Sequence, residues 1–155
     1  TKTILDIGFG SGRDSLYFQN KGYEVYSIDS EEKFCEHAKE LGLKRIYQQR
    51  VQDMNFNDMF DGIWACASLL HVPSIELVEV FNKCYKALKK DGIMYCSFKN
   101  GTYEGIRDGR YYTDLNEDMF KSIISKTNFE IVDICITKDV RPERKEEWLN
   151  CIIKK

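Results

Sequence analysis

The sequence lacks the features that mark a membrane protein, a secreted protein or a zinc protein. No apolar run approaches the roughly 20 residues that a membrane-spanning helix needs, and no pattern of a secretory signal occurs. Only two histidines are present, His37 and His71, and none of the six cysteines forms a Cys-x-x-Cys pair. We therefore expect no metal site and no membrane partner. We also expect a cytoplasmic protein whose cysteines are reduced and lie mostly in the core.

An excess of charge of one sign is also missing. The net charge is -2 and the isoelectric point is near 5.8, so no basic field covers the chain and a nucleic-acid partner is not expected. The 155 residues are 43% hydrophobic and 31% charged, as in ordinary globular proteins. Because there is no internal repeat and no linker, we predict one domain over residues 1–155.

Apolar runs alternate with helical patterns along most of the chain. Strands are predicted at 3–8, 23–29, 45–51, 60–70, 93–98, 129–137 and 147–155. Helices are predicted at 15–22, from Ser30 to Gly42, from Pro73 to Lys90 and after Asn116, with Ser30 as the cap of the second helix. Residues 100–113 are predicted as a polar, glycine-rich connection. This alternation predicts an α/β fold with a Rossmann-like, doubly wound, mostly parallel seven-stranded sheet. The last strand should be antiparallel, because its connection is too short for a parallel crossover.

A glycine ladder lies at the start of the chain, in ILDIGFGSGRD, residues 4–14. Gly8, Gly10 and Gly12 follow a predicted strand and open a predicted helix, which is where open parallel sheets bind ligands. A phosphate, a dinucleotide and an adenosine-type cofactor are all candidates. The dinucleotide fingerprint needs its third glycine at the position of Arg13, and the phosphate-loop motif is absent. The ladder therefore departs from the usual NAD and nucleotide-phosphate patterns.

Asp29 supports a ribose in this site. It ends the second predicted strand, 21 residues after Gly8, where a carboxylate can accept hydrogen bonds from two neighbouring ribose hydroxyls. The alternative is an acidic residue that merely starts a helix.

The whole chain resembles the class I S-adenosylmethionine-dependent methyltransferases. The resemblance is carried by LDIGFGSGRD, VYSIDSE, VQDMNF, FDGIWACASLLHVP and ALKKDGIMYCSF, with a weaker likeness to small bacterial enzymes of the tellurite-resistance type. Phe9 stands where the family usually has a small residue, and the two residues before the first predicted strand offer no counterpart of the helix that usually precedes it. The resemblance implies S-adenosyl-L-methionine as the cofactor and a cofactor cleft that is open beside residues 10–14.

The resemblance also implies roles for individual residues. The glycines would pack against the methionine portion and the ribose, Asp29 would hold the ribose hydroxyls, and Asp53 would accept from the adenine amino group. The full set of implied cofactor residues is Asp6, Gly8, Gly10, Gly12, Arg13, Asp29, Ser30, Asp53, Met54, Cys66, Ala67 and His71. Cys66 could equally be an ordinary strand residue.

Methyl transfer from a sulfonium requires alignment and exclusion of water, and it needs a base only when the nucleophile must lose a proton. His71 is the best proton acceptor by residue type, the alternative being a histidine bonded to backbone at a helix entry. Arginine beside tyrosine in the 100–113 connection suits an anionic or aromatic acceptor, although a solvated loop would look the same. The candidate substrate residues are Arg107, Arg110, Tyr111 and Tyr112, whereas Arg141 and Arg144 are expected at the surface.

Three classes of function remain open at this point. The leading one is a methyltransferase for a small-molecule acceptor. The second is a methyltransferase for nucleic acid or protein, against which the acidic isoelectric point counts. The third is a non-catalytic cofactor-binding partner subunit, against which Asp29 and Asp53 count. The sequence does not indicate an oligomeric state.

Overall fold

A seven-stranded sheet with the order β3-β2-β1-β4-β5-β9-β8 organises the chain, in a computed structural model that describes residues 1–155. Its strands are β1 (Thr3–Ile7), β2 (Glu24–Asp29), β3 (Arg45–Gln48), β4 (Phe60–Ala65), β5 (Leu88–Lys99), β8 (Glu130–Lys138) and β9 (Glu147–Lys154). The helices are α1 (Arg13–Asn20), α2 (Glu32–Glu40), α3 (Ser74–Ala87) and α4 (Glu117–Ile124). Two single-turn 3₁₀ helices, η1 (Val51–Asp53) and η2 (Leu69–His71), follow β3 and β4.

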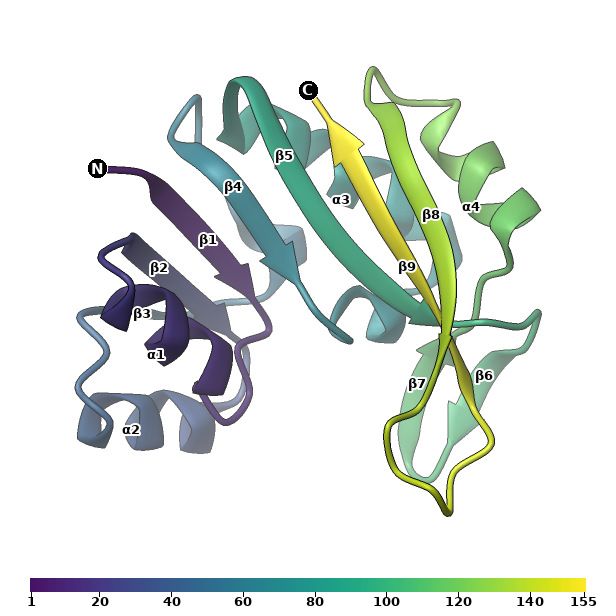
Figure 1. Cartoon of the computed structure of the whole chain (residues 1–155), viewed down its shortest axis with the longest axis horizontal. Coiled ribbons are helices and arrows are strands. Elements are labelled where there is room, and N and C mark those ends of the chain that lie inside the picture. The colour runs from purple at the N-terminus through teal and green to yellow at the C-terminus, as the bar shows by residue number, and fades with distance from the viewer.

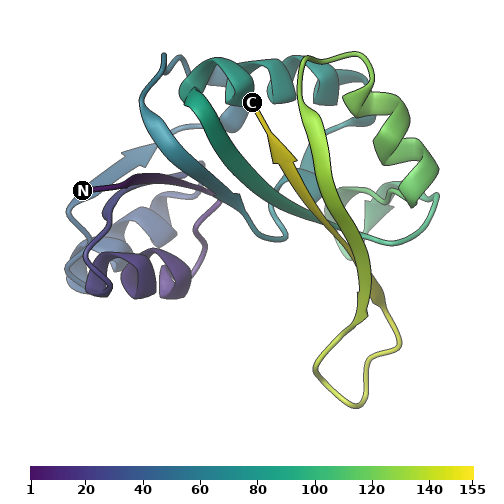
Figure 2. The same cartoon turned by 45° about the horizontal axis from the view of Figure 1, so that its top comes forward.

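The sheet is parallel from β3 to β5, and β9 lies antiparallel between β5 and β8. Helices α1 and α2 lie on one side of the sheet and α3 and α4 on the other, as Figures 1 and 2 show. The predicted fold class, a doubly wound sheet with an antiparallel last strand, is therefore confirmed. The carboxyl ends of β1, β2 and β4 meet at the lower edge in Figure 1, which is the ligand-binding edge of such sheets.

The main core lies between the sheet and helices α3 and α4. It contains 26 buried residues, among them Phe60, Phe81, Phe98 and Phe120, which are completely buried. A second, four-residue cluster of Phe9, Cys35, Ala38 and Leu43 packs beneath α1 and α2. Burial on this scale is what holds a parallel sheet together, because both of its faces exclude water.

The predicted connection at 100–113 is a β-hairpin rather than a loop. Strands β6 (Glu104–Arg107) and β7 (Arg110–Thr113) form a separate two-stranded sheet. Asp108 and Gly109 at its tip have φ angles of 53° and 79°, the backbone of a two-residue turn that matches the twist of paired strands. In Figure 1 this hairpin lies below β5, at the ligand-binding edge.

Two helix starts differ in how they are capped. The predicted cap at Asn116 is present, because its side chain accepts a hydrogen bond from the Met119 backbone N–H at 2.9 Å. The predicted cap at Ser30 is wrong, since α2 starts after Glu31 and has no side-chain cap. The Glu31 N–H donates to Asp29 Oδ1 at 2.9 Å, so a carboxylate fixes the residue from which α2 begins.

The six cysteines are free: four are buried, Cys66 is half-buried and Cys135 is exposed. No helix of the chain combines the length and the apolar composition needed to cross a membrane.

Candidate functional site

The glycine ladder forms a tight turn between β1 and α1. Gly8, Gly10 and Gly12 have φ angles of 68°, 55° and 84°, a left-handed region that residues with a Cβ rarely adopt. A Cβ on Gly8 would lie 2.5 Å from Ser68 Cβ, whereas a Cβ on Gly10 would meet nothing within 4 Å. Gly8 therefore permits a close approach of two loops, and Gly10 leaves open space beside the backbone.

Gly12 and the ring of Phe9 face the side of the turn on which α2 lies. A Cβ on Gly12 would lie 3.1 Å from Leu41 Cδ1 and 3.3 Å from Leu43 Cδ1. The Phe9 ring is 6% exposed and belongs to the small core cluster. The bulky ring between the first two glycines therefore packs inward, and this packing explains how the turn accommodates Phe9.

Asp29 braces the turn from the end of β2. Its Oδ2 accepts a hydrogen bond from the Gly10 N–H at 3.0 Å, and its Oδ1 accepts from the Glu31 N–H at 2.9 Å. Each carboxylate oxygen can accept a second hydrogen bond. Asp29 can therefore hold the backbone and still bind two hydroxyls of a ligand.

A cavity of about 360 Å³ opens beside this turn. Its lining comes from the ends of β1 and β2, from α2, η1 and η2, and from β7. Seven of the predicted site residues line it: Gly8, Gly10, Asp29, Ser30, Ala67, His71 and Arg110. Side chains that the sequence reasoning missed also line it, among them Phe34, Gln49, Arg50, Val51, Gln52, Ser68 and Leu69.

A smaller cavity of about 260 Å³ lies across the same turn. It shares Gly8, Gly10 and Ala67 with the larger one. Its other predicted lining residues are Asp6, Arg13 and Cys66, and Asp14 was missed. The two cavities together form a bipartite site, with the glycine turn at its middle.

The smaller cavity is rich in carboxylates. Asp6 is 2% exposed and accepts a hydrogen bond from the Ser15 hydroxyl at 2.6 Å. Burial raises the pKa of Asp6 to about 7, and the nearby charges of Asp14 and Asp29 add to this shift. The Arg13 side chain is 85% exposed, and its Nε lies 3.4 Å from Asp14 Oδ1. A ligand with a positively charged end suits this cavity.

The loop after β4 closes the site from the other side. Ala67 has a φ of 50°, and its N–H donates to the Ser97 hydroxyl at 2.8 Å. The neighbouring Ser68 hydroxyl is buried and has no hydrogen-bond partner in the chain, although it lies at the larger cavity. An unpaired buried hydroxyl is costly, and a hydrogen bond from a ligand would remove that cost.

His71 is held in a defined orientation at the larger cavity. Its Nδ1 lies 2.9 Å from the Tyr111 carbonyl oxygen, and its ring contacts the Tyr112 ring edge-on at 4.7 Å between centroids. Because a carbonyl can only accept, Nδ1 carries the proton and Nε2 is the basic nitrogen. Burial lowers the pKa of His71, and the positive charges of Arg110 and Lys99 lower it further against the opposing Tyr111 hydrogen bond. A neutral imidazole with a free Nε2 can accept a proton.

Two predicted adenine-binding residues lie beside the larger cavity rather than on its lining. Asp53 is exposed and pairs with Arg50 at 3.0 Å and 3.2 Å. Met54 is completely buried in the main core, and its backbone N–H donates to the Val51 carbonyl at 3.3 Å. The preceding residues of η1 line the cavity in their place, so the roles given to Asp53 and Met54 stay predictions.

The four substrate candidates fall into different environments. Arg107 is held by Asp114 at 2.8 Å and 3.2 Å and lies over the rings of Tyr103 and Tyr112. The Tyr111 hydroxyl donates to Glu104 at 2.5 Å. Arg110 alone of the four lines the larger cavity, and no side-chain hydrogen bond or ion pair holds its guanidinium.

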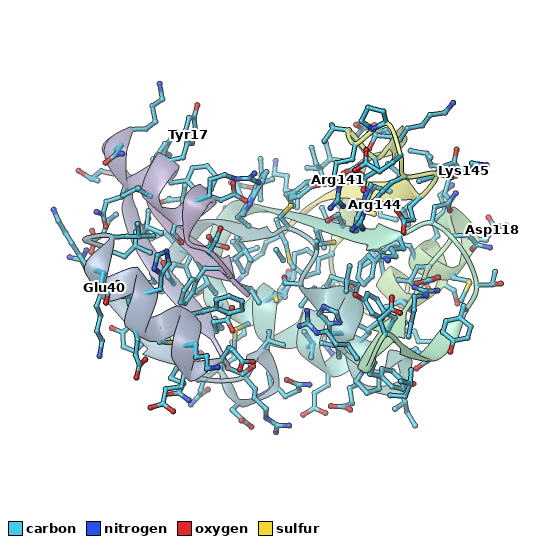
Figure 3. All side chains as sticks on the ribbon, turned by 90° about the horizontal axis from the view of Figure 1, so that it is seen from below. Tyr17, Glu40, Asp118, Arg141, Arg144 and Lys145 are labelled. Atoms are coloured by element: carbon cyan, nitrogen blue, oxygen red, sulfur yellow. The ribbon has the colours of Figure 1, made fainter.

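The remaining arginines of interest lie on the β8–β9 connection. Arg141 pairs with Asp139 at 3.1 Å, and Arg144 lies 4.0 Å from Glu146. Figure 3 views the molecule from the ligand-binding edge and shows Arg141 and Arg144 on the inner side of this connection, with Lys145 at the rim of the molecule. Their side chains are 49% and 43% exposed, as expected for surface residues.

Comparison with protein families gives one match that covers most of the sheet. The family model described as methyltransferase domain matches residues 5–96, the part of the chain from β1 into β5. Phosphoethanolamine N-methyltransferase of Plasmodium falciparum is 26% identical over 156 residues, which cover 88% of this chain and 56% of that protein. The chain thus spans about half the length of this curated relative.

Solved structures share the fold at lower identity. One of them is the 1,6-didemethyltoxoflavin-N1-methyltransferase of Burkholderia thailandensis, solved with bound 1,6-didemethyltoxoflavin and S-adenosylhomocysteine. It has a TM-score of 0.84 at 23% identity, over 99% of this chain and 71% of that chain. The cyclase SpnF has a TM-score of 0.80 at 17% identity, over 99% and 75% of the two chains. Because the second protein is named a cyclase, this fold alone does not fix the reaction.

Proposed function

We propose that this chain, which belongs to the methyltransferase domain family, binds S-adenosyl-L-methionine across the glycine turn and transfers its methyl group to a small-molecule acceptor. The observation that carries the proposal is the bipartite site: cavities of about 360 Å³ and 260 Å³ that share Gly8, Gly10 and Ala67. A ligand with two chemically different ends fits such a site. When bound, S-adenosylmethionine supplies a methyl group on a positively charged sulfur.

The larger cavity has the chemistry for the adenosine end. Asp29 retains acceptor capacity for two ribose hydroxyls beyond its two backbone contacts. Phe34 and Val51 offer apolar surface for a flat ring in the same cavity. The unpaired Ser68 hydroxyl can hydrogen-bond a ligand there.

The smaller cavity has the chemistry for the methionine end. Asp6 and Asp14 supply negative charge near an ammonium group, and Arg13 offers a partner for a carboxylate. A bound cation beside Asp6 would lower the pKa of that carboxyl from about 7 and favour its ionised form.

We further propose that the acceptor carries an anionic group and a nucleophile that loses a proton. Arg110, with no partner for its guanidinium within the chain, is available to an anion, and His71 Nε2 is available as the proton acceptor. A methyltransferase for nucleic acid or protein, and a non-catalytic partner subunit, remain the alternatives.

Isothermal titration with S-adenosylmethionine tests the cofactor proposal, with Asp29→Asn as the variant expected to bind at least tenfold more weakly. A screen with methyl-labelled cofactor over anionic metabolites, RNA and protein then tests the acceptor. Label transferred only to a macromolecule would overturn the small-molecule proposal, and binding without transfer to any acceptor would favour the partner subunit.

Arg110→Ala and Arg107→Ala make a matched pair for the acceptor site. We expect Arg110→Ala to lower kcat/KM for the acceptor without changing the melting temperature, because its guanidinium has no partner in the chain. Arg107→Ala should mainly lower the melting temperature, because it releases Asp114, which is 6% exposed. Equal effects of both variants on kcat/KM would remove the special role of Arg110.

A further inference from the structure

The contacts of Glu104 join three segments of the chain. Its carboxylate accepts hydrogen bonds from the Ser74 N–H at 2.9 Å, from the Ser74 hydroxyl at 2.6 Å and from the Tyr111 hydroxyl at 2.5 Å. Glu104 lies on β6, Ser74 begins α3 and Tyr111 lies on β7. One side chain therefore fastens both strands of the hairpin to the start of the longest helix.

Helix α3 depends on this contact for its cap. Its own N-cap residue is Pro73, which has no side chain that could accept a hydrogen bond, and no local side chain caps the helix. A carboxylate is the favoured group at a helix N-terminus, because the helix dipole and the free N–H groups both attract negative charge. Glu104 supplies this group from a strand 30 residues away in the sequence.

The same junction holds His71. The His71 ring Nδ1 donates to the Tyr111 carbonyl at 2.9 Å. The next residue, Val72, accepts from the Thr113 hydroxyl through its carbonyl at 2.7 Å. Ser74 then donates to Glu104. Residues 71–74 thus lie along the hairpin at three successive points. Displacing the hairpin would remove the carbonyl that fixes which ring nitrogen of His71 carries the proton.

We propose that Glu104 is a positioning residue: it clamps the β6–β7 hairpin to α3 and thereby keeps His71 with its proton on Nδ1 and its Nε2 free for the acceptor. Glu104 lines neither cavity of the bipartite site, so it acts through the hairpin and not on the ligand. The positioning itself is independent of the reaction, but its effect on turnover rests on the proposed function.

Nuclear magnetic resonance of the histidine rings gives a direct test, because the chain has only two histidines. His37 is 53% exposed and far from the hairpin in sequence, and it serves as an internal reference. We expect the nitrogen shifts of the wild-type chain to show His71 as the Nδ1–H tautomer. Glu104→Ala should give a mixed tautomer. Glu79 is exposed on α3 and makes no side-chain hydrogen bond or ion pair, so Glu79→Ala should leave His71 unchanged.

The titration of His71 in the same spectra gives a second readout. Its neighbours are the Tyr111 carbonyl, the Tyr112 ring and the charges of Arg110 and Lys99. Burial is the largest cause of the lowered pKa, so opening the hairpin should raise the pKa of His71 toward its ordinary value. Glu104→Gln, which keeps one accepting oxygen, should restore part of the wild-type behaviour.

Tyr111→Phe protects the test against misfolding of Glu104→Ala. It removes only the hydroxyl that donates to Glu104 and keeps the carbonyl and the ring, so a smaller change in the same direction is expected. Unchanged His71 tautomer and pKa in these folded variants would overturn the proposal.

Turnover separates this inference from the proposed function. With an acceptor in hand, Glu104→Ala should lower kcat roughly tenfold while cofactor affinity stays within about twofold, since the cavity lining is unchanged. Altered His71 spectra in a chain that methylates no acceptor would leave the positioning role standing and refute the proposed function. An unaltered kcat in Glu104→Ala with altered spectra would overturn the catalytic consequence of the clamp.

Discussion

Ser68 offers a test of ligand binding at a single residue. Its hydroxyl is buried beside the larger cavity without a partner in the chain, which costs stability in the free chain, and a hydrogen bond to a ligand would offset this cost. We expect Ser68→Ala to leave the melting temperature unchanged or raise it, while S-adenosylhomocysteine binds roughly fivefold more weakly, about 1 kcal/mol. Thermal melting and calorimetric titration measure the two effects.

Ser122→Ala is the control for this prediction, because Ser122 is exposed on α4 and its hydroxyl has no hydrogen-bond partner in the chain. It should change neither quantity. A clear loss of stability in Ser68→Ala, with affinity intact, would show that the hydroxyl serves the fold instead of the ligand.

Asp6 gives the turn a dependence on pH. Its pKa is raised to about 7, so the folded chain binds this proton more tightly than the unfolded chain does. The resulting stabilisation is complete below about pH 4 and is lost as the pH rises through about 7, at up to about 1.4 kcal/mol per pH unit. We therefore expect Asp6→Asn, which cannot ionise, to gain stability relative to the wild type as the pH rises from 4 to 8.

Melting temperatures of both chains across that pH range measure this difference. Other carboxyl groups titrate in the same range, but they are common to both chains and cancel in the comparison. Parallel curves for the two chains would contradict a raised pKa at Asp6.

At the scale of the element, the glycine turn separates a structural position from a binding position. Gly8 and Gly10 both have positive φ angles, so alanine at either one costs about 1–2 kcal/mol in backbone strain. Gly8→Ala adds a clash with Ser68 Cβ at 2.5 Å, whereas Gly10→Ala meets no atom within 4 Å. We expect Gly8→Ala to lower the melting temperature several degrees more than Gly10→Ala.

Binding should respond to Gly10→Ala as well. The added methyl group occupies space that lines both cavities, so S-adenosylhomocysteine affinity should fall at least tenfold in a chain that still melts cooperatively. Unaffected binding would mean that the ligand does not approach the Gly10 backbone.

At the scale of the whole molecule, the site should discriminate between adenosine-containing ligands. Arg13 stands where a dinucleotide site needs its third glycine, and the smaller cavity carries Asp6 and Asp14, which repel a pyrophosphate. We expect S-adenosylhomocysteine at 100 times its Kd to stabilise the chain by about 2.7 kcal/mol, and NAD at the same concentration to give a much smaller shift in melting temperature. Equal shifts would overturn the assignment of the site.

Local sequence patterns were enough to predict the seven-stranded sheet, the helices that alternate with its strands and the glycine turn. These features depend on local patterns: apolar runs of strand length, helical spacing, and glycines where φ must be positive. Asp29 could be predicted because it stands at a strand end close behind the turn. The β6–β7 hairpin was also within reach of the sequence, since Asp108-Gly109 is a turn pair that favours hairpins, but the polar composition of 100–113 pointed to a loop.

The candidate residues that meet in the site could be identified only in the folded structure. Arg107 and Arg110 are alike in sequence, yet one pairs with Asp114 and the other lines the cavity, because they face different neighbours across one turn. Ser68, Glu104 and the tautomer of His71 gave no local signal. Their roles depend on distances between β6, β7, η2 and the start of α3, and those distances are set by packing between segments far apart in the chain, which no local sequence pattern encodes.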